Sequence, residues 1–271
     1  MLGLYPPSAF DAYKKEKTHF SAAVDATVEK IHAACDGIGT DDKALVKLLG
    51  PLSPNERGLI SLRYKELHGQ SLRDLVKSET SGDFGYLLQL ICFTLPQAEA
   101  YILFHAMKGA GTSDHLLYSV LMGRTNEEIG LLKKAFFEMY DTDLSVAISD
   151  EISGDFLAVI MKALQVSRPY RAPTTDFHTT KALIHLFRLN TNPWSFLAEH
   201  IEGTMAGIGT DETALSAAIV RYHSYLGRIL PAYEKKYKMS LHDRIQKEVS
   251  GEYQELLLQL LEAPRSVGSF A

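Results

Sequence analysis

The chain has 271 residues, of which 46% are hydrophobic and 23% charged, and its formal net charge is −5. Its apolar content suffices for one large core or several small ones, and the acidic balance argues against nucleic acid as a partner. No stretch approaches the roughly 18 apolar residues of a membrane-spanning helix, and no secretion signal is visible. With only two cysteines, a disulfide framework is not indicated either, so we expect a cytoplasmic protein whose membrane contacts are peripheral.

Apolar residues recur with helical spacing along most of the chain, and no segment alternates as a strand would. Residues 1–20 form a tail without such a pattern. One helix is predicted just beyond Thr40 and another beyond Ser81, and the same pair of stripes returns in the middle of the chain and near its end. The expected fold class is all-α, built from repeated units of about 70 residues.

A Gly-x-Gly-Thr segment precedes the first helix of each pair. The copies read CDGIGTDD at Cys35–Asp42, MKGAGTSD at Met107–Asp114 and MAGIGTDE at Met205–Glu212. Each is followed by a Glu ahead of Ser-Gly, and the interval from the first loop glycine to that Glu is 42, 42 and 41 residues for Glu79, Glu151 and Glu248. We interpret the Thr of each copy as the N-cap of the helix after it.

Such a loop has a specific chemical use. Glycine tolerates positive φ, so a Gly-x-Gly turn can point its backbone carbonyls outward as hard oxygen ligands for calcium. A Glu from another loop adds a bidentate carboxylate and leaves positions open to water or phosphate. The residue between the glycines, which is Ile38, Ala110 or Ile208, is expected at the loop tip, where it can press into lipid headgroups.

In these loops and in their spacing to the Glu residues, the chain resembles the annexins, whose repeat has five helices with a GxGT loop between the first two. The resemblance covers three modules: the first module (21–93), the second module (94–165) and the last module (194–263). The last module is similar to the fourth annexin repeat. Residues 264–271 form a C-terminal tail.

A third repeat is largely missing between the second and last modules. The second and last Glu are 97 residues apart, compared with 72 for the first two. KALIHLFRLNTNP, which begins at Lys181, resembles KALVKLLGPLSPN, which begins at Lys43. We therefore interpret residues 166–193, which we call the remnant, as a linker and one surviving helix of the third repeat. Its glycine loop is gone.

The resemblance implies the ligands of three calcium sites. Each site would use three backbone carbonyls and one carboxylate: Cys35, Gly37, Gly39 and Glu79; Met107, Gly109, Gly111 and Glu151; Met205, Gly207, Gly209 and Glu248. With one carboxylate per site we expect an affinity of roughly 10⁻⁴ M or weaker in solution, increased by avidity on anionic phospholipid membranes. The family's Lys before the loop glycine is present only as Lys108, which favours the second site. The shorter interval to Glu248 puts the last site in doubt.

Other interpretations of the same residues carry less weight. Asp141–Ser145 begins like an EF-hand but lacks its Gly and final Glu, no HExxH pair predicts zinc, and no base and nucleophile are paired as an enzyme would need. One alternative is a cytoskeletal or scaffold protein that uses the fold without calcium. The missing repeat also predicts uncovered apolar surface on the second module, which the remnant covers or which drives self-association.

Overall fold

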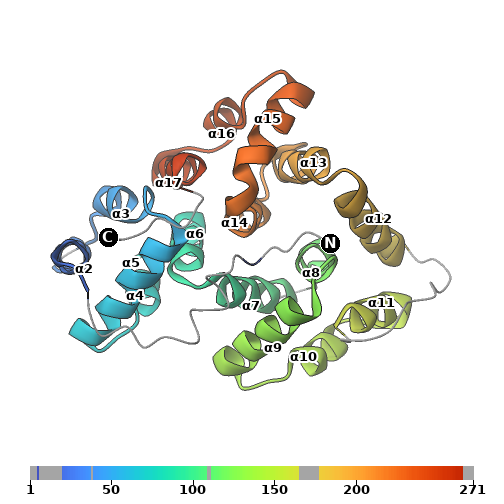
Figure 1. Ribbon diagram of the computed structural model, residues 1–271, viewed down its shortest axis with the longest axis horizontal. Helices are drawn as coiled ribbons and strands as arrows, with labels where there is room; N and C mark the ends of the chain where they lie inside the picture. The colour runs from blue at the N-terminus through green and yellow to red at the C-terminus, as the bar shows by residue number, and fades with distance from the viewer. Residues whose placement is uncertain (1–4, 6–19, 38, 109–110, 165–176, 265–271) are drawn as a thin grey trace. The chain divides into compact units, whose positions relative to one another are not determined.

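The computed structural model describes residues 5, 20–37, 39–108, 111–164 and 177–264 (Figure 1). Within these ranges the chain is helical and has no strand, so the all-α prediction is confirmed. The first module contains α2 (Ala22–Ala34), α3 (Asp42–Leu49), α4 (Pro54–His68), α5 (Leu72–Glu79) and α6 (Gly82–Cys92). The second module contains α7 (Leu95–Met107), α8 (Asp114–Leu121), α9 (Asn126–Tyr140), α10 (Leu144–Glu151) and α11 (Gly154–Leu164).

The remnant contributes α12 (Phe177–Thr191). The last module contains α13 (Pro193–Met205), α14 (Glu212–Arg221), the short 3-10 helix η1 (His223–Tyr225), α15 (Leu226–Tyr237), α16 (Leu241–Glu248) and α17 (Gly251–Glu262). No described helix is both long and apolar enough to cross a bilayer.

The chain forms two compact units. One contains residues 7–94 and 198–271, and therefore joins the first module to most of the last. In it α14 packs on α6, and α17 packs on α3 and α6. The approach of α17 is close: a Cβ added to Gly50 would lie 2.8 Å from the Gln259 Cβ. The apolar stripes predicted on α6 and α17 face this core, where Leu87, Leu88, Leu256 and Leu257 are fully buried.

The other unit contains residues 1–6 and 95–197, so it joins the second module to the remnant. Helix α12 packs against α8 and α11, and it runs parallel to α8. At its start His178 Nδ1 lies 2.7 Å from Asp114 Oδ2. Farther along, the ring of His185 contacts that of Tyr118, and Leu189 lies so close to Gly123 that an added Cβ would come within 2.8 Å of it. The remnant therefore covers part of the second module.

The opposite face of α12 stays exposed. Large apolar side chains stand on it, with exposed fractions of 66% for Phe177, 51% for Ile184 and 67% for Phe187. By contrast, Ala182, His185 and Leu189 on the inner face are buried. A single helix, α12, therefore buries one side against the second module and leaves the other side without a described cover.

Tyr5 is the one described residue before Phe20, and it is buried in a polar network of the second module. Its hydroxyl donates to Glu99 Oε2 at 2.5 Å, and its backbone N–H donates to Glu128 Oε1 at 2.7 Å. The Arg124 guanidinium also bonds Glu99 and lies 4.9 Å from the centre of the Tyr5 ring. Burial and the Glu99 carboxylate hold the pKa of Tyr5 well above its usual value, so the phenol remains a donor.

Changing Tyr5 to Phe should lower the free energy of unfolding by about 1–3 kcal/mol, because Glu99 is fully buried and loses a hydrogen bond to its charge. Urea unfolding, followed by circular dichroism, measures the change. An unchanged urea midpoint would mean that Tyr5 does not bind here in solution.

Candidate metal centres

The glycine loops have the backbone conformation that outward carbonyls require. Gly37 and Gly39 have φ of 113° and 85°, and Gly207 and Gly209 have φ of 112° and 82°. In the second module Gly111 has φ of 127°, whereas Gly109 lies outside the described residues. Nothing lies within 4 Å of a Cβ added to any of these described glycines, so only backbone strain opposes a side chain there.

Each loop is closed by the same backbone hydrogen bond. The backbone N–H of the residue that follows the Thr donates to the carbonyl of the residue that precedes the first predicted ligand. The bonds run from Asp41 to Ala34, from Ser113 to Ala106 and from Asp211 to Thr204, and each is 2.8 Å long. This bond recurs in all three modules, so the described ends of the three loops are closed in the same way.

The loop Thr reaches the distal Glu in every module. Thr40 Oγ1 donates to Glu79 Oε2 at 3.0 Å, Thr112 Oγ1 to Glu151 Oε2 at 3.3 Å, and Thr210 Oγ1 to Glu248 Oε2 at 3.3 Å. Each predicted carboxylate therefore lies beside the loop with which it was paired from the sequence. This contact joins the loop to the last residue of a helix 38 or 39 residues farther along the chain.

The prediction that Thr caps the helix after the loop is wrong. The N-cap residues are Asp41, Ser113 and Asp211, and the side chains of Asp41 and Asp211 accept from the backbone N–H groups of Ala44 and Ala214 at 2.9 Å. An Asp at the N-cap also suits the positive end of the helix dipole. The Thr hydroxyl is thereby free to bind the Glu.

The donors around each loop are mixed. Among the described residues no group of three or more His, Cys, Asp and Glu side chains could hold a metal, so a bound cation would depend on backbone carbonyls with a single carboxylate. That donor set suits a hard cation such as calcium rather than zinc. In the described part of the chain no Lys, Arg or His pairs with Glu79 or Glu151.

The Cys35 side chain is not part of this donor set. Burial, together with Glu79 and Asp42, raises the pKa of its thiol to about 11. Burial likewise raises the pKa of Cys92 to about 12. Both cysteines are free and protonated, which fits a structural role rather than nucleophilic chemistry.

The predicted membrane contacts are only partly described. Ile208 is fully exposed at the tip of the last loop. Lys108 is exposed as well, and its ammonium lies 5.4 Å from the centre of the Phe104 ring. Ile38 and Ala110 lie outside the described residues.

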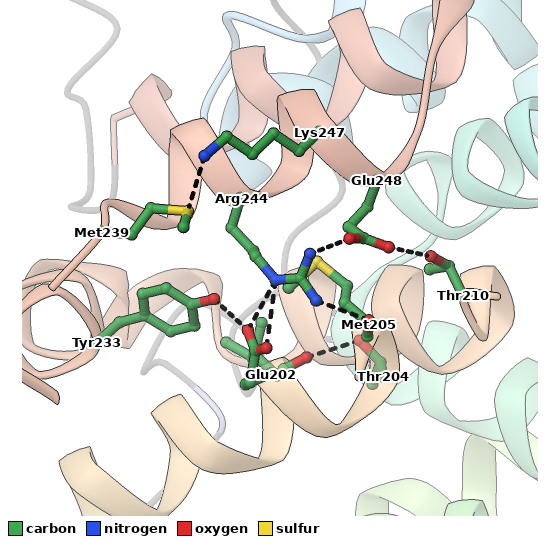
Figure 2. Close-up of polar contacts among 10 residues, drawn as sticks. Glu202, Thr204, Met205, Thr210, Tyr233, Met239, Arg244, Lys247 and Glu248 are labelled. Carbon is green, nitrogen blue, oxygen red and sulfur yellow. Dashed lines mark hydrogen bonds and ion pairs between the residues drawn. The ribbon is translucent and has the colours of Figure 1, made fainter. Parts of the chain in front are cut away.

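The last module differs in one respect that the sequence did not predict. Arg244 Nη1 bonds Glu248 Oε1, and Arg244 Nη2 donates to the Met205 carbonyl at 2.7 Å (Figure 2). Two predicted ligands of the last site are thus held by a guanidinium. The signal was present in the i,i+4 spacing of Arg244 and Glu248 on one helix, but the contact with Met205 depends on how α16 and α13 meet.

Gly39→Ala should lower the free energy of unfolding by about 1 kcal/mol, because φ is positive there and a side chain is strained even in open space. Gly58→Ala, in the interior of α4 with equally open surroundings, should raise it by about 0.5–1 kcal/mol. Urea unfolding in calcium-free buffer compares the two variants. Equal effects would show that the loop backbone differs from that described.

Comparison with known proteins gives a consistent result. The family model described as Annexin matches residues 26–91, 98–163 and 196–260. Annexin A13 of Canis lupus familiaris is 27% identical, over 92% of this chain and 98% of that protein. Annexin A5 of Gallus gallus is 30% identical, over 93% of this chain and 74% of that protein.

Solved structures show the same fold. Annexin III superposes with a TM-score of 0.82 at 24% identity, over 92% of this chain and 96% of that one. A structure described as calcium-bound annexin (Sm)1 superposes with a TM-score of 0.76 at 24% identity, over 91% and 92% of the two chains. The three matched repeats, the helical fold and the repeated loops agree: the chain belongs to the annexin family.

Proposed function

We propose that this protein binds anionic phospholipid membranes in a calcium-dependent manner, through the GxGT loops of its first and second modules. Calcium-dependent phospholipid binding is general in the annexin family, to which the chain belongs. The ligands proposed are the carbonyls of Cys35, Gly37 and Gly39 with Glu79, and those of Met107, Gly109 and Gly111 with Glu151. The last loop is left out of this proposal because Arg244 occupies two of its ligands.

The hydrogen bond from the loop Thr to the distal Glu is the observation that carries the proposal. It brings a carboxylate to a turn in which the described glycines, Gly37, Gly39 and Gly111, are already at positive φ. A cation that enters there needs no rearrangement of the main chain on the scale of a helix. Calcium accepts 6 to 8 oxygens, so three carbonyls and a bidentate carboxylate leave positions for lipid phosphate.

Electrostatics explains why calcium would be required. The chain has a formal net charge of −5, so an anionic leaflet repels it on average. A calcium ion shared between Glu151 and a lipid phosphate replaces that repulsion with attraction on both sides. Each site is weak alone, and simultaneous binding of several loops to one bilayer supplies the affinity.

The second module should bind more strongly than the first. Lys108 is exposed next to the second loop and can add a contact with phosphate. The corresponding residue of the first module is Asp36, also exposed, which repels phosphate. Both cysteines are buried thiols of raised pKa, which makes them poor nucleophiles.

Sedimentation with phosphatidylserine vesicles across a calcium titration tests the proposal. The wild-type chain should pellet with vesicles as calcium rises, and Glu79→Gln with Glu151→Gln should shift the half-maximal calcium concentration upward by about tenfold or more, because each change removes a charged ligand.

Glu127→Gln is the matched control. Glu127 is exposed near the start of α9, which follows the end of α8 farther from the second loop, so its titration curve should equal that of the wild type. Absence of pelleting at millimolar calcium would contradict the proposal. Sedimentation with filaments in the absence of calcium would then favour the scaffold alternative.

The exposed face of α12 supports self-association as a second property. Phe177, Ile184 and Phe187 lie on the helix that replaces the missing repeat, and exposed apolar surface of this kind commonly binds a partner. A second copy of the chain offers the same face. One helix face is smaller than a standard interface, so we expect weak, transient association.

Sedimentation velocity over a concentration series should show this association for the wild type, and Phe187→Ser should abolish it. Phe137→Ser serves as the control, because Phe137 on α9 is also an exposed large side chain but lies on another helix. A wild-type chain that stays monomeric at all concentrations would exclude self-association through α12.

A further inference from the structure

The last module holds a positive charge of its own beside its glycine loop. Arg244 lies on α16, one helical turn before Glu248, and its guanidinium bonds both that carboxylate and the Met205 carbonyl. Figure 2 shows the guanidinium between these two groups. Both would be calcium ligands by analogy with the first two modules, so an inference about this site rests on the proposed function.

All three nitrogens of the guanidinium are engaged. Nη1 binds Glu248 and Nη2 binds Met205, while Nε lies 3.2 Å from each carboxylate oxygen of Glu202 on α13. Glu202 in turn accepts a hydrogen bond from the Tyr233 hydroxyl of α15. Three helices therefore hold Arg244 in place, and its side chain is only 17% exposed. Planar, multidentate contacts of this kind are the ones for which arginine is suited.

Arg244 carries a permanent positive charge, because an arginine guanidinium is charged at any physiological pH. A charge-assisted bond between this group and Glu248 is stronger than a neutral hydrogen bond.

Neither of the other two modules has an equivalent. At the position four residues before the distal Glu, the first module has Leu75 and the second has Ala147. At the position of Glu202, three residues before the first ligand, they have His32 and Phe104. In the first module Tyr64, which matches Tyr233, bonds His32 at 2.9 Å instead of a carboxylate. The arginine and its supporting carboxylate therefore occur together in the last module.

We propose that Arg244 is an internal counter-cation that takes the place of calcium in the last module and makes its loop insensitive to calcium. A carboxylate oxygen and a carbonyl that accept from a guanidinium are not available to a metal at 2.3–2.6 Å. Calcium would have to displace Arg244 and then bind beside a positive charge that stays tethered to Glu202. The arginine holds the loop against Glu248 without any metal, so the last module is folded and closed at every calcium concentration.

The test isolates the last module. In a parent with Glu79→Gln and Glu151→Gln, the first two sites are weakened, and calorimetric titration with calcium chloride reports on the third. Arg244→Leu and Glu202→His are then added, which give the last module the residues found at the same positions of the first module, Leu75 and His32. The second change is needed because Glu202 would otherwise lose its arginine partner. Calcium affinity should rise by about tenfold or more, since one charge-assisted bond no longer competes.

Melting in calcium-free buffer gives a readout that does not depend on calcium binding. The same two changes should lower the Tm by about 3–6 °C, because the internal cation is lost, and millimolar calcium should recover most of the difference. Lys247→Leu in the same parent is the matched control. It removes one positive charge from the same helix, but Lys247 reaches Met239 rather than the loop, so neither the calcium affinity nor the response of the Tm to calcium should change.

Two results would overturn the proposal. One is a calcium affinity that is the same with and without Arg244. The other is a calcium affinity of the parent variant, which still has Arg244, that equals the affinity of the first two modules in the unmodified chain. Failure of the proposed function looks different: the unmodified chain would not pellet with phosphatidylserine vesicles at millimolar calcium, whereas the calcium-free melting comparison would still report whether Arg244 stabilises the loop.

Discussion

The hydrogen bond from the loop Thr to the distal Glu is the contact on which the candidate sites depend. It connects the glycine loop of a module to the end of a helix 38 or 39 residues farther along the chain. The contact is possible only because the helices between them return the chain to the end from which it started. Helix packing within a module therefore determines whether a carboxylate reaches the loop, and the glycines then determine whether carbonyls can share the same cation.

The interpretation of α12 as the remnant of a third repeat, which stays a prediction, illustrates how such modules depend on their neighbours. A module exposes apolar surface where the next one would pack, and here a single helix, α12, meets that surface. It lies along α8 and α11 with His185 and Leu189 inward. One helix cannot bury apolar residues on both faces, so Phe187 and Ile184 face outward. A single helix in this place therefore moves the exposed apolar surface from one element to another rather than removing it.

Much of this architecture could be predicted from the sequence, because it depends on periodic features. The stripes of α6 and α17, the positive φ of Gly37 and Gly207, and the pairing of each loop with its Glu all follow from residues at regular intervals. The predicted capping residue was wrong because Thr and Asp are both good N-caps and only the Glu contact decides between them. Tyr5 was missed because its partners Glu99 and Glu128 are far away in the chain. No local pattern indicates such a contact.

The contact of Arg244 with Glu248 follows from their local i,i+4 spacing, whereas its contact with Met205 depends on residues far away in the chain. The positive charge of Arg244 also has a consequence for the whole chain. If the last loop is held by a guanidinium as proposed, calcium would enter only the first and second modules. Two ions with two positive charges each would change the formal net charge from −5 to −1, so the chain would stay slightly acidic when calcium-loaded. Long-range attraction to an anionic leaflet would then be weak, and membrane binding would depend on direct bridging of lipid phosphate at two loops. A protein of this kind should leave the membrane promptly when calcium falls, because the loss of either bridge removes most of the avidity.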